Sequence, residues 1–537
     1  MSLRRILVRT SITTATKGRK GEERMTDIAK PPTSGAGGDG GTEPPAMKAS
    51  AQKDIAGATT LKRNTLTLPE VLAQSVANAA PSAAMALLPL LVFLNAGNGS
   101  WFAFVIAVIT MVMVGYCAAQ FAKRINSAGS FYVWITRAFG PGAGHTAGWA
   151  LQLGYLATGV ATVYGFAIFG GDLLHRLVPA IDATSPATLI VLFAIDTLLA
   201  VSVAIYDINL SARTSLTLEA ISILAILTLC VSIWVVRGPI DTKQLTFSGV
   251  VPGGVIIGVV LAIFAFVGFE SAGSLGMEAK NPYKNVGRAI VVSAAFVGTL
   301  YVLVSYSQTL GFQPTNGGYA KSEAPMPDLA DLIGAPILAT VISAGITISV
   351  FACTLACINA SARIALTMAH DGMGVPALTR THARRKTPNV AIWVMAVPMF
   401  LVPLITTVMG KSPIDGTGWA GTLATFGFML AYAMVSIGAP IFLRRIGESS
   451  VPVWIVGVIG LVAMVVVFYS SWLPTTLNWI LPFPPLEGVY AYLPYVFFAW
   501  TAIGLAWFFI VRAQKPEVAR ALGSRYETVE EHAATAG

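Results

Sequence analysis

Twelve long apolar segments constrain this chain more than any other feature of its sequence. They follow one another from Thr67 onward, with short polar loops between them, and each runs for about 17–30 residues. A helix of that length crosses the roughly 30 Å hydrocarbon core of a bilayer. The sequence therefore predicts an all-α integral membrane protein with twelve transmembrane helices. The segments span residues 70–96, 101–122, 144–170, 187–206, 215–236, 254–275, 287–311, 335–367, 388–409, 420–443, 453–472 and 490–511.

The composition indicates a membrane protein rather than a soluble one. Apolar residues make up 55% of the 537 residues and charged residues 11%, against about 45–50% and about 25% in soluble domains. The mean hydropathy is +0.69. The net charge of +9 does not indicate a nucleic-acid partner, because twelve of the 35 Lys and Arg residues lie within residues 1–63. The predicted surroundings are the lipid bilayer.

Three regions follow from this pattern. Residues 1–66 are polar, rich in Gly, Pro and Thr and poor in aromatic residues, which predicts a disordered N-terminal tail. Residues 67–512 form the twelve-helix domain, and residues 513–537 form a C-terminal tail. The opening of the chain is basic and rich in hydroxyl groups, like an organellar transit peptide. Because Met25 begins a second plausible start, the sequence leaves translation from Met1 or from Met25 open.

The loops between the segments carry unequal numbers of basic residues. Thirteen Lys and Arg residues lie in loops that follow even-numbered segments, and five lie in loops that follow odd-numbered segments. Cytoplasmic loops of membrane proteins are enriched in Lys and Arg. We therefore expect both tails to be cytoplasmic, in a multi-pass protein of the cell membrane.

Two of the apolar segments contain residues that interrupt a helix. The first segment contains Ala80-Pro81-Ser82-Ala83-Ala84, and the sixth contains Val267-Gly268-Phe269-Glu270-Ser271-Ala272-Gly273. Backbone groups freed by such breaks persist at membrane depth where they line a cavity. A kink at Pro81 and close packing at the glycines would be the structural alternative. Because the breaks occupy matched places in two consecutive sets of five segments, an inverted-repeat secondary transporter with a midplane site is favoured.

Other classes of chemistry have weak support in the sequence. Four cysteines lie inside apolar segments, and the pair Cys353 and Cys357 on one helix face is more typical of packing than of a metal site. The five histidines lie near segment ends or in tails, so no nucleophile and base, and no metal cluster, are predicted at membrane depth. No repeated filter motif indicates a channel. We predict neither an enzyme nor a metal centre.

Three stretches resemble amino acid permeases of the amino acid-polyamine-organocation (APC) superfamily. GFESAGSLGMEAKNPYKNVGRAI is similar to the sixth-helix signature, with its G-F-E triplet and E-x-x-NP. FAKRINSAGSFYVWITRAFGP is similar to the loop after helix two, and Ser361-Ala-Arg363 through HDGMGVPALTRTHARRKTPNVAI to the end of helix eight. The resemblance covers roughly residues 67–512.

This resemblance implies a leucine-transporter-type fold. In such a fold two sets of five helices form a 5+5 inverted repeat, and helices 1 and 6 are broken. It implies a secondary active transporter that moves amino acids by alternating access. The alternative of the same fold is a transporter or exchanger of polyamines or other organic amines. No cofactor is implied beyond coupling to H⁺ or Na⁺, and the oligomeric state is left open.

The resemblance also implies a substrate site at the two breaks. The substrate carboxylate would bind exposed amides of the first break, and the ammonium group would meet carbonyls of the breaks. An aromatic side chain of helix six would cover the substrate, and the acid of the G-F-E triplet would lie beside it. The implied substrate-binding residues are Ser82, Ala83, Ala84, Phe264, Val267, Gly268 and Glu270.

Three residues are candidates for ion coupling. Some proton-coupled relatives carry a lysine in helix five, and Ser222 occupies that place here, in a segment that has no lysine. The sequence leaves open protonation of Glu270 or Glu219, sodium bound by hydroxyls and carbonyls, or plain exchange. A further acid, Asp196, lies in the fourth segment, for which we expect a structural pairing.

Overall fold

The computed structural model describes residues 67–125, 130–206, 211–250, 252–275, 279–315, 317–382, 387–472 and 487–522. The chain divides into two units, Met1–Thr60 and Leu61–Gly537, and all described residues belong to the second. The tail predicted at residues 1–66 and most of the tail predicted at 513–537 lie outside the described residues.

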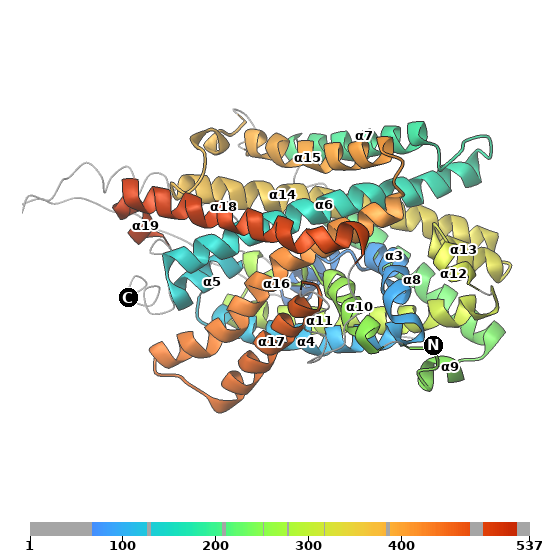
Figure 1. Cartoon of the computed structure of the whole chain (residues 1–537), viewed down its shortest axis with the longest axis horizontal. Coiled ribbons are helices and arrows are strands. Elements are labelled where there is room, and N and C mark those ends of the chain that lie inside the picture. Colours follow the sequence, from blue (N-terminus) through green and yellow to red (C-terminus); the bar gives the residue numbers. More distant parts are fainter. Residues whose placement is uncertain are drawn as a thin grey trace, which may run out of the picture. The chain divides into compact units, whose positions relative to one another are not determined.

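The described residues form an all-helical unit (Figure 1). Its α-helices are α2 (Leu68–Asn78), α3 (Pro81–Ala96), α4 (Ser100–Ala122), α5 (Ser130–Phe139), α6 (Pro141–Leu177), α7 (Pro186–Tyr206), α8 (Ser211–Arg237), α9 (Thr242–Leu245), α10 (Pro252–Phe264), α11 (Pro282–Phe312), α12 (Gly318–Lys321), α13 (Pro325–Leu332), α14 (Pro336–His370), α15 (Asn389–Val408), α16 (Pro413–Arg445), α17 (Val451–Ser470), α18 (Leu493–Gln514) and α19 (Pro516–Ala521). The 3₁₀ helices are η1 (Gly97–Gly99), η2 (Phe269–Leu275), η3 (Gln313–Thr315), η4 (Pro376–Thr379) and η6 (Gly488–Tyr492).

Ten helical spans within the described ranges are long and apolar enough to cross a membrane. One of them, Pro81–Ala122, contains α3 and α4 joined by η1, so the second half of predicted segment one and the whole of segment two fall within a single span. Predicted segment six consists of the 13-residue α10 followed by η2, and it is not among the ten. Helical structure continues past the predicted boundary at residue 512, through the end of α18 and α19.

The helix starts follow from local sequence. Proline occupies the first turn of many helices, including α3, α6, α11, α14 and α16, where its missing N–H needs no partner. At the start of α2, the Thr67 N–H donates to Glu70 Oε2 at 2.7 Å, as expected when an N-cap residue is followed three positions later by glutamate. The start of the first segment is therefore encoded within four residues.

Helices that lie five segments apart in the chain pack against one another. In this way α4 lies against α11, α6 against α14, and α7 against α15. The last pair is visible as two neighbouring helices along one edge of the bundle in Figure 1. The halves of segment one follow the same pattern, because α3 packs on α10 and α2 packs on η2. The two interrupted segments therefore meet in the interior of the bundle.

Ion pairs tie the helices together at their ends. At the C-terminal end of α6, Arg176 donates to Asp172 Oδ2 at 2.7 Å and to Asp331 Oδ2 of α13, also at 2.7 Å. At the end of α4, Arg124 pairs with Glu448 in the loop between α16 and α17 at 2.5 Å. The short helix α13 is thereby held against the end of α6.

Candidate functional site

The first interruption lies at Ala79–Ala80, between the end of α2 and the start of α3. Ala80 has φ 42° and ψ 58°, in the left-handed region, and it comes directly before Pro81. Proline disfavours the α-helical conformation of the preceding residue, so the helix cannot run through this position. The sequence placed the interruption within Ala80–Ala84. It lies at the beginning of that stretch, because Pro81 starts a new helix and Ser82–Ala84 form its first turn.

A carboxylate from α8 lies at the start of α3. The Ser82 N–H donates to Glu219 Oε1 at 2.8 Å, and both side chains are buried. The Ser82 and Ser349 hydroxyls lie next to the same carboxylate. The first N–H groups of a helix have no partner within it and attract anions. Glu219 therefore satisfies one of the amides that the resemblance assigns to the substrate carboxylate.

Ser222 belongs to the same polar region. It lies one turn after Glu219 on α8, and its hydroxyl faces Gly345 of α14, where any added Cβ atom would lie only 2.7 Å from Ser222 Oγ. Ser222 is 1% exposed, and its hydroxyl has no hydrogen-bond partner among the described residues. The coupling candidates Glu219 and Ser222 thus lie together beside the first break, between α3 and α14.

The second interruption lies between the end of α10 at Phe264 and the start of η2 at Phe269. Gly268 has φ 102°, a conformation that glycine adopts without steric cost. The freed Ala265 carbonyl accepts a hydrogen bond from the Tyr301 hydroxyl at 2.7 Å. The Gly268 carbonyl accepts one from the Ser271 N–H at 3.0 Å. The interruption predicted around Gly268 is therefore present.

Glu270 connects three elements of the bundle. Its Oε1 accepts from the Tyr155 hydroxyl of α6 at 2.9 Å. Its Oε2 accepts from the Tyr432 hydroxyl of α16 at 3.2 Å and from the Gly268 N–H at 3.1 Å. These three donors stabilise an ionised carboxylate inside the bundle, where an unpaired one would be expensive. Glu270 is 3% exposed and closes a clasp between α6, η2 and α16.

A cavity of about 60 Å³ lies where the two breaks meet. It is small beside the roughly 300 Å³ or more of typical ligand pockets. Four predicted site residues line it, namely Ala83, Ala84, Phe264 and Val267, whereas Ser82, Gly268 and Glu270 lie outside its lining. The other lining residues are Ala79, Ala80, Leu87, Leu88, Thr158, Ala161, Thr162, Gly165, Phe169, Ala265, Val350, Cys353 and Thr417.

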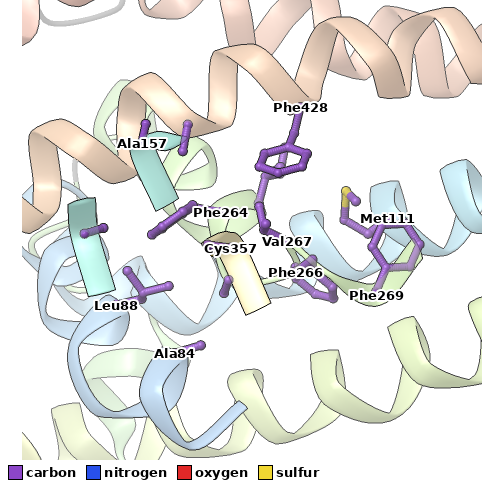
Figure 2. Packing of buried hydrophobic residues seen from close by; sticks show 14 of the residues in the cluster. Ala84, Leu88, Met111, Ala157, Phe264, Phe266, Val267, Phe269, Cys357 and Phe428 are labelled. Carbon is purple, nitrogen blue, oxygen red and sulfur yellow. The ribbon is translucent and has the colours of Figure 1, made fainter. Parts of the chain in front are cut away.

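Phe264 lines this cavity. In Figure 2 its ring points toward Leu88 of α3 and Ala157 of α6, while Phe266 and Phe269 lie away from it, near Met111. Phe264 packs closely on α16, where a Cβ atom added to Gly421 would lie 2.8 Å from the ring. Because Gly421 lacks a side chain, the ring fits between α10 and α16.

The sequence analysis did not identify the residues of α6 and α14 that line the cavity. Thr158 and Thr162 lie one turn apart on α6, and Cys353 lies on α14. The available signal was the pair of hydroxyl residues at i and i+4 in LATGVATVYG, since such a pair lies on one helix face. For Asp196, where we expected a structural pairing, the structure provides one hydrogen bond, which its Oδ2 accepts from the Thr354 hydroxyl at 2.9 Å.

Ten apolar spans, and an interior cavity at two broken helices, are the features of a multi-pass membrane protein. The chain belongs to the amino acid permease family, whose family model matches residues 70–520. This confirms the resemblance found in the sequence.

The chain is similar to several transport proteins from bacteria. The chain is 25% identical to the branched-chain amino acid permease BcaP of Bacillus subtilis (strain 168), over 65% of this chain and 75% of that protein. It is 25% identical to the methylthioribose transporter of the same organism, again over 65% and 75%. It is 26% identical to BcaP of Lactococcus lactis subsp. cremoris (strain MG1363), over 66% and 76%. These three relatives are all transport proteins.

Proposed function

We propose that this protein is a secondary active transporter that moves apolar amino acids across the membrane by alternating access, and that it is not an enzyme. The observation that carries this proposal is the cavity at the two helix breaks. Helix starts and unwound carbonyls at such breaks suit the carboxylate and ammonium groups of an amino acid. The cavity walls suit an apolar side chain.

The lining of the cavity supports a neutral substrate over a polycation. Its polar side chains are threonines and Cys353, and no acidic or basic side chain lines it within the described residues. A polyamine needs several anionic partners, because burying a cation without them is costly. The branched-chain permeases among the relatives agree with an apolar amino acid. The methylthioribose transporter makes a thioether sugar the competing ligand to test.

The helix packing supports the proposed 5+5 inverted repeat of twelve transmembrane helices. In such a repeat, the first helix of one half corresponds to the first helix of the other, and so on in order. The pairs of α4 with α11, α6 with α14 and α7 with α15 follow that order. We infer a location in the cell membrane with both tails in the cytoplasm, from the distribution of Lys and Arg in the loops.

Ion coupling belongs to the same proposal. Glu219 and Ser222 lie beside the first break, and Glu270 lies beside the second. A cation that binds at Glu219, either H⁺ or Na⁺, would neutralise the carboxylate at the start of α3. The amides there would then become available to the carboxylate of the substrate. Glu270 remains the second candidate, because a change of its charge would alter its hydrogen bonds to Tyr155 and Tyr432.

Counterflow in proteoliposomes tests the proposed function. We expect vesicles loaded with unlabelled leucine to take up radiolabelled leucine in a saturable way, because an alternating-access carrier exchanges bound substrate. Apolar amino acids should compete, and lysine, spermidine and methylthioribose should not. Vesicles without protein are the control. Failure of every amino acid to exchange would contradict amino acid transport, and competition by spermidine alone would favour the amine alternative.

Cys353 provides an independent test of the cavity. Its side chain lines the cavity, whereas Cys117, Cys230 and Cys357 are at most 4% exposed. We expect a small thiol-reactive methanethiosulfonate to inhibit counterflow, because the added group fills the cavity. Saturating leucine should slow that inhibition. The measurement is the rate of inactivation with and without leucine.

Two variants serve as controls for the thiol experiment. Cys353→Ser should be insensitive to the reagent, whatever its own transport rate. Cys117→Ser should retain the sensitivity of the unmodified protein, because Cys117 is buried away from the cavity lining. Inactivation that leucine does not slow would place the substrate elsewhere.

A further inference from the structure

Asp196 is a buried acid that the proposed mechanism does not use. It lies in the middle of α7 and is 0% exposed. Its Oδ2 accepts from Thr354 of α14, and its Oδ1 has no hydrogen-bond partner among the described residues. A single hydroxyl is little compensation for a carboxylate in the membrane interior. Such an acid is a candidate functional group, and its partner has to be found.

No positive side chain lies near Asp196 in the described structure. The elements packed against α7 are α6, α14 and α15. On these helices, Tyr164 contacts Phe193 one turn from Asp196, while Cys353 and Cys357 lie within one turn of Thr354 on α14. The charged residues and histidines of α6 and α14 lie farther along, and the nearest, Arg363, is nine residues from Thr354. α15 contains no titratable residue.

A chain of hydroxyls connects Asp196 to the cavity. Thr354 Oγ1 lies 2.9 Å from Asp196 Oδ2 and 2.9 Å from Thr162 Oγ1. Thr162 lines the cavity, next to Thr158 and Val350. Two hydrogen bonds therefore separate the carboxylate from the surface that a substrate would touch.

Each threonine in this chain of hydroxyls has a single hydrogen to donate. Thr354 has one hydroxyl hydrogen, and its oxygen also lies 3.3 Å from the Val350 carbonyl. An ionised carboxylate is the strongest acceptor of the three neighbours, so it takes that hydrogen. Thr162 also has one hydroxyl hydrogen, which lies within reach of Thr354 Oγ1 and of its own-helix acceptor, the Gly159 carbonyl at 3.0 Å. Whichever of the two takes that hydrogen, the Thr162 oxygen keeps a lone pair that can accept a hydrogen bond from the cavity.

We propose that Asp196 is a positioning residue for the ammonium group of the substrate, acting through Thr354 on the Thr162 hydroxyl. The Thr162 oxygen presents an acceptor to the cavity, and the negative charge of Asp196 behind it attracts a cationic group. The bound ammonium in turn supplies the positive partner that Asp196 lacks. This inference rests on the proposed function, because it takes the cavity as the amino acid site.

The test compares leucine with 2-hydroxy-4-methylpentanoate, which has the same side chain and carboxylate but no ammonium group. In Asp196→Asn, we expect the KM for leucine counterflow to rise about tenfold, with the maximal rate largely kept. The inhibition constant of the hydroxy acid should change little, so the preference for leucine over the hydroxy acid falls by about the same factor. An equal change for both ligands, or no change, would overturn the proposal.

Variants of the connecting threonine keep the inference testable if Asp196→Asn does not fold. Thr354→Val removes the connection and should reduce the preference for leucine, whereas Thr354→Ser retains the hydroxyl and should restore it. Thr197→Val is the matched control, because Thr197 is the buried neighbour of Asp196 and its hydroxyl has no partner among the described residues. It should keep the wild-type preference. Equal preferences in Thr354→Val and Thr354→Ser would also overturn the proposal.

Wild-type leucine counterflow separates this inference from the proposed function. If the wild-type protein does not exchange leucine or any other amino acid, the proposed function fails and the inference fails with it. If it exchanges leucine and the variants keep its preference over the hydroxy acid, only the role of Asp196 is rejected.

Discussion

Replacing Glu219 with glutamine is expected to abolish ion-driven accumulation of substrate while counterflow persists. The glutamine side chain still offers an oxygen to the Ser82 N–H, which Glu219 accepts at 2.8 Å, so the start of α3 should keep its structure. The substitution removes the negative charge that competes with the substrate carboxylate for that helix terminus. Substrate binding then no longer depends on a cation, and an ion gradient cannot drive it.

The measurement is the accumulation ratio of leucine under a tenfold gradient of H⁺ or of Na⁺. With one ion per substrate, a tenfold gradient sustains roughly a tenfold accumulation, since each tenfold ratio corresponds to about 1.4 kcal/mol. In Glu219→Gln the ratio should fall to about one. Glu323→Gln, which changes an exposed acid in the loop before α13, should accumulate like the wild type. A Glu219→Gln variant that still accumulates tenfold would exclude Glu219 from coupling.

Ser222→Ala distinguishes the two ions. A sodium ion prefers several oxygen ligands, and the Ser222 hydroxyl is a buried oxygen without a partner in the described structure. If sodium is the coupled ion, Ser222→Ala should weaken the sodium dependence of uptake. If the proton is the coupled ion, the same variant should leave the pH dependence in place.

Replacing Glu270 with glutamine is expected to flatten the pH dependence of uptake. Glu270 accepts three hydrogen bonds, two of them from the tyrosine hydroxyls of α6 and α16. Hydrogen bonds to a charged group contribute about 1.5–3 kcal/mol, so loss of the charge weakens the clasp by an amount worth tenfold or more in an equilibrium. Glutamine keeps the size of the side chain and removes the titration. Insertion and some substrate exchange should therefore remain.

Initial uptake rates between pH 5 and pH 8 provide the measurement for Glu270. Tyr432→Phe is the matched control, because it removes one donor of the clasp and leaves the carboxyl group of Glu270 able to titrate. It should lower the rate and keep the shape of the pH profile. A Glu270→Gln variant with the rate and profile of the wild type would make Glu270 a purely structural residue.

The sequence predicts where the helices are interrupted better than it predicts which residues contact the buried acids. Gly268 and Pro81 each break a helix for a local reason, namely a positive φ at the glycine and the restriction that the proline places on Ala80 before it. The first break lies at the beginning of the predicted stretch Ala80–Ala84, because Pro81 begins a new helix. Local rules also identify the start of α2 at Thr67 and Glu70.

The partners of the buried acids depend on tertiary contacts. Tyr155 and Tyr432 lie 115 and 162 residues from Glu270 in the chain. Ser82 lies 137 residues from Glu219. No periodicity in a single segment encodes which helix faces which, so these contacts and the cavity wall on α6 came only from the structure. The acids themselves were evident, because a charged residue in an apolar segment is costly.

The length of α6 has a mechanical consequence. At 37 residues it is about 55 Å long, well beyond the roughly 30 Å of the hydrocarbon core. Three contacts lie along this one helix: Tyr155 donates to Glu270, Thr162 lines the cavity, and Arg176 pairs with Asp331 of α13. If α6 tilts about its middle, its two ends move in opposite directions. Thr162, close to the middle, would move least, so the cavity wall would be displaced less than either end of the helix.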